Sequence, residues 1–209
     1  MPYIISEENR IEGVEQKTTP NMGGKFTPKR RRFIIIHYTA GPSLEGTLRT
    51  FANPKKQVSA HLVIDRDGKI AQVVPFNRVA WHAGASSWKP AGSRKIVGLN
   101  NYSIGIELVN AGPLTFTPGS GYFTWWGAVV PPTEVVEVDP KAPESFHKKF
   151  WHRFPGEQIS TLVDIAEALT SWYGLEDILG HSDVAPGRKT DPGPAFPMNN
   201  VRSALYGRV

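Results

Sequence analysis

The stretch Phe33-Ile34-Ile35-Ile36-His37-Tyr38 is short, apolar and rich in isoleucine, and a histidine stands near its end. A continuous apolar run of this length is typical of a strand that is buried on both faces. A second stretch, residues 102–110, alternates isoleucine and leucine with smaller or polar residues. We expect this second stretch to form the central strand of a sheet.

Strand and helix signals alternate around these two stretches. Apolar residues recur at helical spacing from Ile159 to Tyr173, and Gly174 is a typical helix end. Asp67-Gly68 is a strong hairpin signal between two apolar runs. This order predicts an α/β fold with a mixed central β-sheet flanked by helices. The expected helices are 43–51, 159–173 and 199–206, and the other expected strands are 60–65, 70–75, 79–82 and 178–180.

The 209 residues suit one domain with a proper core. We expect residues 1–32 to form a polar, irregular N-terminal arm and residues 33–209 to form the domain. Residues 111–155 carry several prolines and tryptophans and are interpreted as an insertion with a hairpin around Pro131-Pro132. We expect this insertion to border the functional cleft, the alternative being that it packs on the far side of the sheet.

Charge and composition exclude several kinds of partner. The formal net charge of +5 suits a polyanionic partner, but the only dense basic cluster, Lys29-Arg30-Arg31-Arg32, has no interleaved aromatic residues. We therefore expect no nucleic-acid partner. No apolar stretch has the length of a membrane span, so no membrane insertion is expected. The polar N-terminal residues do not resemble a signal peptide, which predicts a chain that is cytoplasmic as synthesised.

One loop late in the chain, rich in glycine and proline, carries His181, Lys189 and Asp191. Fixed turns hold such side chains toward a common point. With His37 the loop supplies two imidazoles and one carboxylate, the ligand set of a catalytic zinc site. Each residue alone has a simpler explanation, such as a hydrogen-bonded histidine at a strand end, a turn-capping aspartate or a solvated lysine. Glu107 is harder to explain, because an ionised carboxylate inside an apolar strand needs a partner or a function.

Five segments occur in an order that resembles a known family. Together they are similar to the zinc-dependent N-acetylmuramoyl-L-alanine amidases of the peptidoglycan-recognition fold, and in particular to their AmpD-like branch. The match covers about residues 33–206 apart from the insertion. The segments are IHYTAG at 36–41, SAHLVI at 59–64, AWHAG at 80–84, NYSIGIEL at 101–108 and GHSDVAPGRKTDPGP at 180–194.

The resemblance implies roles for individual residues. It makes His37, His181 and Asp191 the ligands of a Zn²⁺ cofactor, and it gives Glu107 and Lys189 catalytic roles. Glu107 is expected to move the proton of the attacking water and Lys189 to stabilise the oxyanion. The reaction implied is hydrolysis of the amide bond between the muramic acid lactyl group and L-alanine, with peptidoglycan or muropeptides as substrate.

Four further residues are candidates for contact with substrate. They are Tyr38, His82, His61, which we interpret mainly as a strand residue beside the site, and Arg94. Relatives that prefer diaminopimelate in the stem peptide carry an arginine nine positions before the catalytic glutamate, where this chain has Gly98. We expect Arg94, or next Lys95, to take over that carboxylate.

Two other functions remain open at this stage. A non-catalytic peptidoglycan-binding module would lack a metal ligand, and a zinc peptidase would cut within the stem peptide. Cell-wall recycling, release as a phage lysin and delivery to the cell wall as a toxin would all use the same catalytic domain. The sequence does not decide among these roles, nor does it give the oligomeric state.

Overall fold

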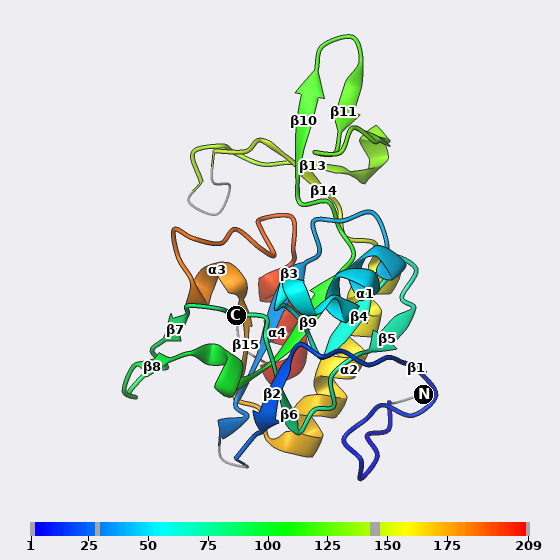
Figure 1. The fold of residues 1–209 in the computed structure, drawn as a ribbon. Coiled ribbons are helices and arrows are strands. Elements are labelled where there is room, and N and C mark those ends of the chain that lie inside the picture. Colours follow the sequence, from blue (N-terminus) through cyan, green and yellow to red (C-terminus); the bar gives the residue numbers. More distant parts are fainter. Residues whose placement is uncertain (1–2, 28–29, 143–146, 208–209) are drawn as a thin grey trace.

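A six-stranded mixed β-sheet forms the centre of the computed structural model, which describes residues 3–27, 30–142 and 147–207 (Figure 1). Four adjacent strands, β4, β9, β3 and β15, run parallel to one another, and β5 pairs antiparallel with β4. The mixed sheet and the central place of the 102–110 stretch are as the sequence predicts. In spatial order the strands are β1 (Glu15–Gln16), β5 (Ile70–Gln72), β4 (Leu62–Ile64), β9 (Ser103–Leu108), β3 (Phe33–Tyr38) and β15 (Asp177–Gly180).

Side-chain alternation divides the central strands between two apolar layers. Ile34 and Ile36 pack with helices α2 (Gly156–Tyr173) and α4 (Met198–Tyr206) on one face. Phe33 and Ile35 belong to a cluster on the other face, where α1 (Leu44–Ala52) also packs. Because successive strand residues point to opposite faces, the face of Phe33 and Ile35 also receives the side chain two positions further along β3. That residue is His37.

The helix ends match their sequence signals. Ser43 caps α1, and its hydroxyl oxygen accepts a hydrogen bond from the Gly46 N–H at 3.1 Å. Gly174 ends α2 in the left-handed conformation, with φ of 66°. The remaining elements near the main sheet are β2 (Met22–Lys25), η2 (Pro54–Lys56), β6 (Arg78–Ala80), β7 (Ser87–Trp88), β8 (Ile96–Val97), η3 (Leu99–Asn101) and α3 (His181–Val184).

The N-terminal arm is more ordered than its polar composition predicts. Strand β1 extends the main sheet beside β5, and β2 pairs with β6. Ile5 and Ile11 are buried in the core layer that contains α2. Single apolar residues in a polar segment give no periodicity, so the sequence pattern does not predict that this arm packs on the domain.

The insertion forms a second, antiparallel sheet, which Figure 1 shows at the top of the view, beyond the main sheet. The predicted hairpin around Pro131-Pro132 is wrong, because Pro132 begins a short 3-10 helix and the flanking strands β12 and β13 lie at opposite edges of this sheet. The hairpin instead joins β10 and β11, where Gly119 and Gly121 adopt positive φ. In spatial order the strands are β12 (Val129–Val130), β11 (Gly121–Phe123), β10 (Pro113–Thr117), β14 (Phe150–His152) and β13 (Val135–Glu137), with η4 (Pro132–Glu134) between β12 and β13.

Two arginines of the basic cluster are engaged within the fold. The Arg31 guanidinium lies 3.5 Å from the ring centre of Tyr173, and Arg32 forms an ion pair with Glu176. Lys29 lies outside the described residues. These contacts support a structural interpretation of the cluster. No helix in the part of the chain that the structure describes is long and apolar enough to cross a membrane.

Candidate metal centre and substrate cleft

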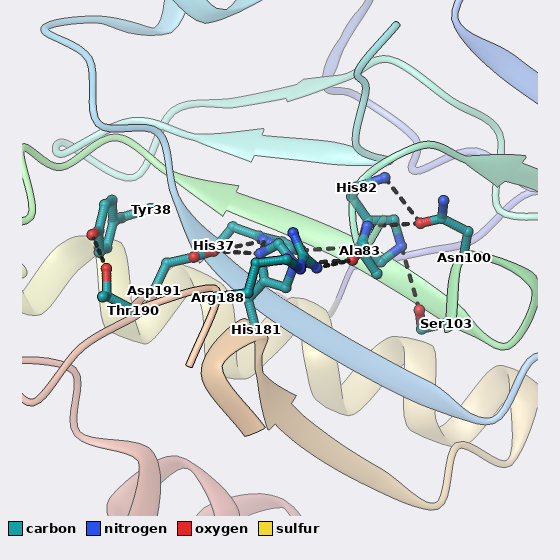
Figure 2. Close-up of polar contacts among 10 residues, drawn as sticks. All are labelled: His37, Tyr38, His82, Ala83, Asn100, Ser103, His181, Arg188, Thr190 and Asp191. Carbon is teal, nitrogen blue, oxygen red and sulfur yellow. Dashed lines mark hydrogen bonds and ion pairs between the residues drawn. The ribbon is translucent and has the colours of Figure 1, made fainter. Parts of the chain in front are cut away.

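Two neighbouring parallel strands bring the histidines together at their carboxyl ends. Gly180 of β15 pairs with Ile36 of β3, so His181 follows one strand beside His37 on the other. The Ser182 N–H donates to the Asp191 carbonyl oxygen at 2.8 Å and folds the loop back on itself. Asp191 Oδ2 lies 2.8 Å from His37 Nδ1 and 2.9 Å from His181 Nδ1, and the two Nδ1 atoms are 3.0 Å apart (Figure 2).

Hydrogen bonds on the outer side of each ring assign the tautomers. His181 Nε2 lies 3.1 Å from the Ala83 carbonyl oxygen, which only accepts, so this nitrogen carries the proton. The Ser103 hydroxyl donates to the Leu99 carbonyl oxygen at 2.6 Å, so it accepts from His82 Nε2 at 3.3 Å. His82 Nδ1 then accepts from His37 Nε2 at 3.0 Å.

This network leaves an unprotonated Nδ1 on both His37 and His181, and both face Asp191 (Figure 2). Burial lowers the pKa of His37 and favours its neutral form. Burial acts to raise the pKa of Asp191, but its close contacts with the His181 and His37 rings outweigh burial and lower this pKa, so the carboxyl is ionised. The two nitrogen lone pairs and the carboxylate oxygen lie close together, and a cation among them would be attracted by all three. Two nitrogens and one oxygen are donors that suit zinc.

Glu107 lies on the same face of the sheet as His37, because the two residues are direct neighbours on β9 and β3. Its Oε2 atom is buried without a hydrogen-bond partner among the described residues. Burial, followed by the nearby charge of Asp191, raises the pKa of Glu107 to about 8, while Lys189 acts in the opposite direction. A carboxyl group in this state can exchange a proton near neutral pH and is not occupied by a structural contact.

The centre opens into a cleft of about 690 Å³. Glu107 and Lys189 line it together with His37, His181 and Asp191. The loop after β3 and the helix α1 form one part of the wall, and Trp81, His82 and Arg188 form another. All five residues expected to carry the chemistry are therefore brought to one cleft.

The four candidate substrate contacts are placed differently. Tyr38 lines the cleft, with its hydroxyl 2.7 Å from the Thr190 hydroxyl, and His82 lines it as well as supporting His37. His61 is fully buried, and its ring binds the Arg78 carbonyl and the Gly105 N–H. The structure therefore does not bring His61 into the cleft.

Arg94 lies at the other end of the sheet. It belongs to the loop between β7 and β8, and three neighbours in that loop line a separate hollow with Phe33, Glu176 and Asp177. These three residues stand at or near the amino ends of β3 and β15, whereas the metal centre is at the carboxyl ends. The structure thus separates Arg94 from the cleft, because the loop that contains Arg94 lies at the opposite end of the sheet.

Arg188 and Trp125 line the cleft, although the sequence analysis did not single them out. Arg188 donates to the carbonyl oxygens of Ala83 and Ala85 at 2.8 and 2.7 Å, and its position inside the GHSDVAPGRKTDPGP segment was an available signal. Trp125 reaches the cleft from the insertion, and its place depends on the pairing of the small sheet, which no local pattern gives.

Comparison with known proteins identifies amidases as relatives of this chain. The family model for N-acetylmuramoyl-L-alanine amidases matches residues 27–194. The chain is 34% identical to the 1,6-anhydro-N-acetylmuramyl-L-alanine amidase AmpD of Escherichia coli, over 95% of this chain and 96% of AmpD. It is 33% identical to the amidase AmiD of the same organism, over 85% of this chain, and spans about half (54%) of AmiD.

Solved structures of amidases have a similar fold. A crystal structure of an AmpD derivative superposes with a TM-score of 0.65 at 25% identity, covering 97% of this chain and 99% of AmpD. The structure of E. coli AmiD with anhydro-N-acetylmuramic acid-L-Ala-D-γ-Glu-L-Lys gives a TM-score of 0.61 at 29% identity, covering 84% of this chain and 57% of AmiD. The α/β fold predicted from the sequence is the fold of these amidases.

Proposed function

The chain belongs to the N-acetylmuramoyl-L-alanine amidase family, and on this basis we propose that it is a zinc hydrolase that cuts the amide bond between the lactyl group of muramic acid and L-alanine. The substrate class is a muropeptide or peptidoglycan, as in the AmiD complex with an anhydromuramic acid peptide. One observation carries the proposal. The hydrogen-bond network turns the Nδ1 lone pairs of His37 and His181 toward the Asp191 carboxylate, beside Glu107, whose Oε2 has no hydrogen-bond partner among the described residues.

His37, His181 and Asp191 would hold the zinc ion. When bound, zinc supplies an electrophile that polarises the amide carbonyl and makes water more acidic. The hydrogen bonds of His82 and Ala83 keep the two imidazoles in the required tautomer and orientation. The protein therefore contributes a preorganised set of ligands whose outer side is already satisfied.

Glu107 moves the proton. In its ionised form, which the charge of Lys189 favours, Glu107 accepts a proton from the water whose oxygen attacks the carbonyl carbon. Glu107 then delivers this proton to the amide nitrogen as the carbon–nitrogen bond breaks. The products are the lactyl carboxylate on the sugar and a peptide with a free L-alanine amine. The Lys189 ammonium, in the same cleft, stabilises the negative charge that develops on the carbonyl oxygen.

Product analysis tests this function. The chain purified with zinc is incubated with a muropeptide, and the products are identified by mass spectrometry. We expect an intact stem peptide that starts with L-alanine, together with an intact sugar that carries a free lactyl carboxylate. Cleavage within the stem would instead indicate a peptidase, and binding without cleavage would indicate a recognition module.

A matched pair of variants links the activity to the centre. Asp191→Asn should lose both zinc and turnover, whereas Asp164→Asn, an exposed carboxylate on α2, should keep both. Chelation should abolish the activity of the parent protein, and added zinc should restore it. Persistent activity of the metal-free protein would contradict the proposal.

A further inference from the structure

The insertion places one exposed aromatic ring at the cleft. Trp125 lies in the turn between β11 and β12, lines the cleft and is 71% exposed. An indole that is open to water in the wall of a cleft offers a flat apolar face to a ligand bound there. Resting on the proposed amidase function, we propose that Trp125 is a platform on which the pyranose ring of the muramic acid stacks, so that it forms the glycan-binding end of the cleft.

The ring is held in place although it is exposed. The turn that carries it is closed by hydrogen bonds from the Thr124 N–H to the Ala128 carbonyl oxygen and from the Ala128 N–H to the Thr124 hydroxyl, both 2.9 Å. The indole N–H donates to the Ala40 carbonyl oxygen at 2.8 Å. A side chain fixed before the ligand arrives loses less entropy on binding than a mobile one does.

The contact with Ala40 also sets the position of the ring relative to the metal centre. Ala40 follows His37 by three residues and has φ of 48°, which an alanine seldom adopts. Thr39 ties this loop to the main sheet, because its N–H donates to the Leu108 carbonyl oxygen at 3.0 Å. The platform is thus connected through one short loop to the strand that carries a metal ligand.

The two ends of the cleft differ in chemistry. Trp125 and the loop after Tyr38 form one end. Arg188 and Lys189, with Trp81, line a second hollow that continues the cleft, and Trp125 is not part of it. In Figure 2, Tyr38 lies at the left of the view beside Thr190, whereas Arg188 lies next to His181 and reaches toward Ala83.

The substrate has unlike halves on the two sides of the bond that is cut. The muramic acid half is a pyranose with apolar C–H faces, which match the flat face of an indole. The stem peptide carries carboxylates, which match guanidinium and ammonium groups. With the amide at the metal centre, this complementarity places the sugar over Trp125 and the peptide toward Arg188.

Product inhibition separates the two halves experimentally. The inhibition constants of N-acetylmuramic acid and of the free stem peptide are measured for the zinc-loaded parent protein, Trp125→Ala and Trp125→Phe. We expect Trp125→Ala to weaken inhibition by the sugar about three- to tenfold, to raise KM for the muropeptide by a similar factor and to leave inhibition by the peptide unchanged. Trp125→Phe keeps a flat ring but loses the N–H donor, and it should retain most of the sugar affinity.

Trp172→Ala, at an exposed tryptophan of α2 outside the cleft, is the matched control and should change neither constant. Equal weakening of both products by Trp125→Ala and by Trp125→Phe would mean that the indole only supports the Ala40 loop, which would overturn the platform. A loss of sugar affinity in Trp81→Ala instead of Trp125→Ala would reverse the orientation and overturn it as well. A parent protein that cleaves no muropeptide would contradict the proposed function itself, so the two failures are distinguishable.

Discussion

Glu107 stands beside His37 in the sheet but binds no other described side chain through Oε2. The proposed role as proton carrier predicts that Glu107→Gln keeps its zinc but loses turnover by a factor of about 10²–10⁴. The measurement pairs zinc content with kcat on a muropeptide. Glu45→Gln, at an exposed glutamate of α1, is the control and should behave as the parent does. Loss of zinc from Glu107→Gln at an unchanged fold would assign this residue to metal binding instead.

Gly105 is required for the packing of His82. A Cβ atom at this position would overlap the His82 ring, which supports His37 through a hydrogen bond. Gly105→Ala should therefore displace His82 and lower zinc affinity about 10- to 100-fold, the usual effect of losing an outer partner of a ligand. Competition with a chromophoric chelator measures this affinity. Gly24→Ala is the control, because a Cβ atom there meets nothing within 4 Å, and an equal affinity in both variants would refute the role of His82.

His61 gives the fold a defined acid sensitivity. Burial lowers its pKa from 6.5 to about 4, so the folded protein holds this ring neutral where the unfolded chain protonates it. The stabilisation is complete above pH 6.5 and is lost as the pH falls toward 4, by at most about 3 kcal/mol. Urea unfolding at pH 7 and pH 4.5 should show a smaller loss for His61→Gln than for the parent. Equal losses would mean that His61 is not the responsible group.

Trp151 couples the small sheet to the catalytic loop. It is 1% exposed on β14, and Gly193, two residues after Asp191, passes so close that a Cβ atom would overlap its ring. Trp151→Ala should cost about 3–5 kcal/mol of folding free energy and lower the Tm by about 6–20 °C. Calorimetry measures this change. Trp172→Ala should change stability by less than about 0.5 kcal/mol, and a similarly small effect of Trp151→Ala would mean that the insertion is energetically independent.

At the level of elements, strong local patterns were predictive. The run Phe33–Tyr38, the Asp67-Gly68 turn and the Gly174 cap each determine their structure through neighbours in sequence, and each is found as predicted. The hairpin at Pro131-Pro132 failed because β12 and β13 are two- and three-residue strands that pair with β11 and β14 and not with each other. Such strands are too short to show a period, and their pairing is set by the sheet as a whole.

At the scale of the whole molecule, the sequence predicts the grouping of His37, His181 and Asp191 better than the placement of the candidate substrate contacts. The ligands belong to two rigid parallel strands and a loop tied to them, so their motifs imply their positions. Arg94 lies in a loop and Trp125 in the insertion, and the paths of both segments depend on tertiary packing. The first was expected in the cleft and lies at the other end of the sheet, whereas the second was unassigned and lines the cleft.

Anomalous diffraction at the zinc edge, from crystals of the zinc-loaded protein, locates the metal relative to its proposed ligands. We expect one strong peak about 2.0–2.2 Å from Nδ1 of His37, Nδ1 of His181 and an oxygen of Asp191. Glu107 should remain outside this ligand set. A peak that is absent from this position, or that is bound through the Nε2 atoms, would contradict the centre on which the proposed hydrolysis depends.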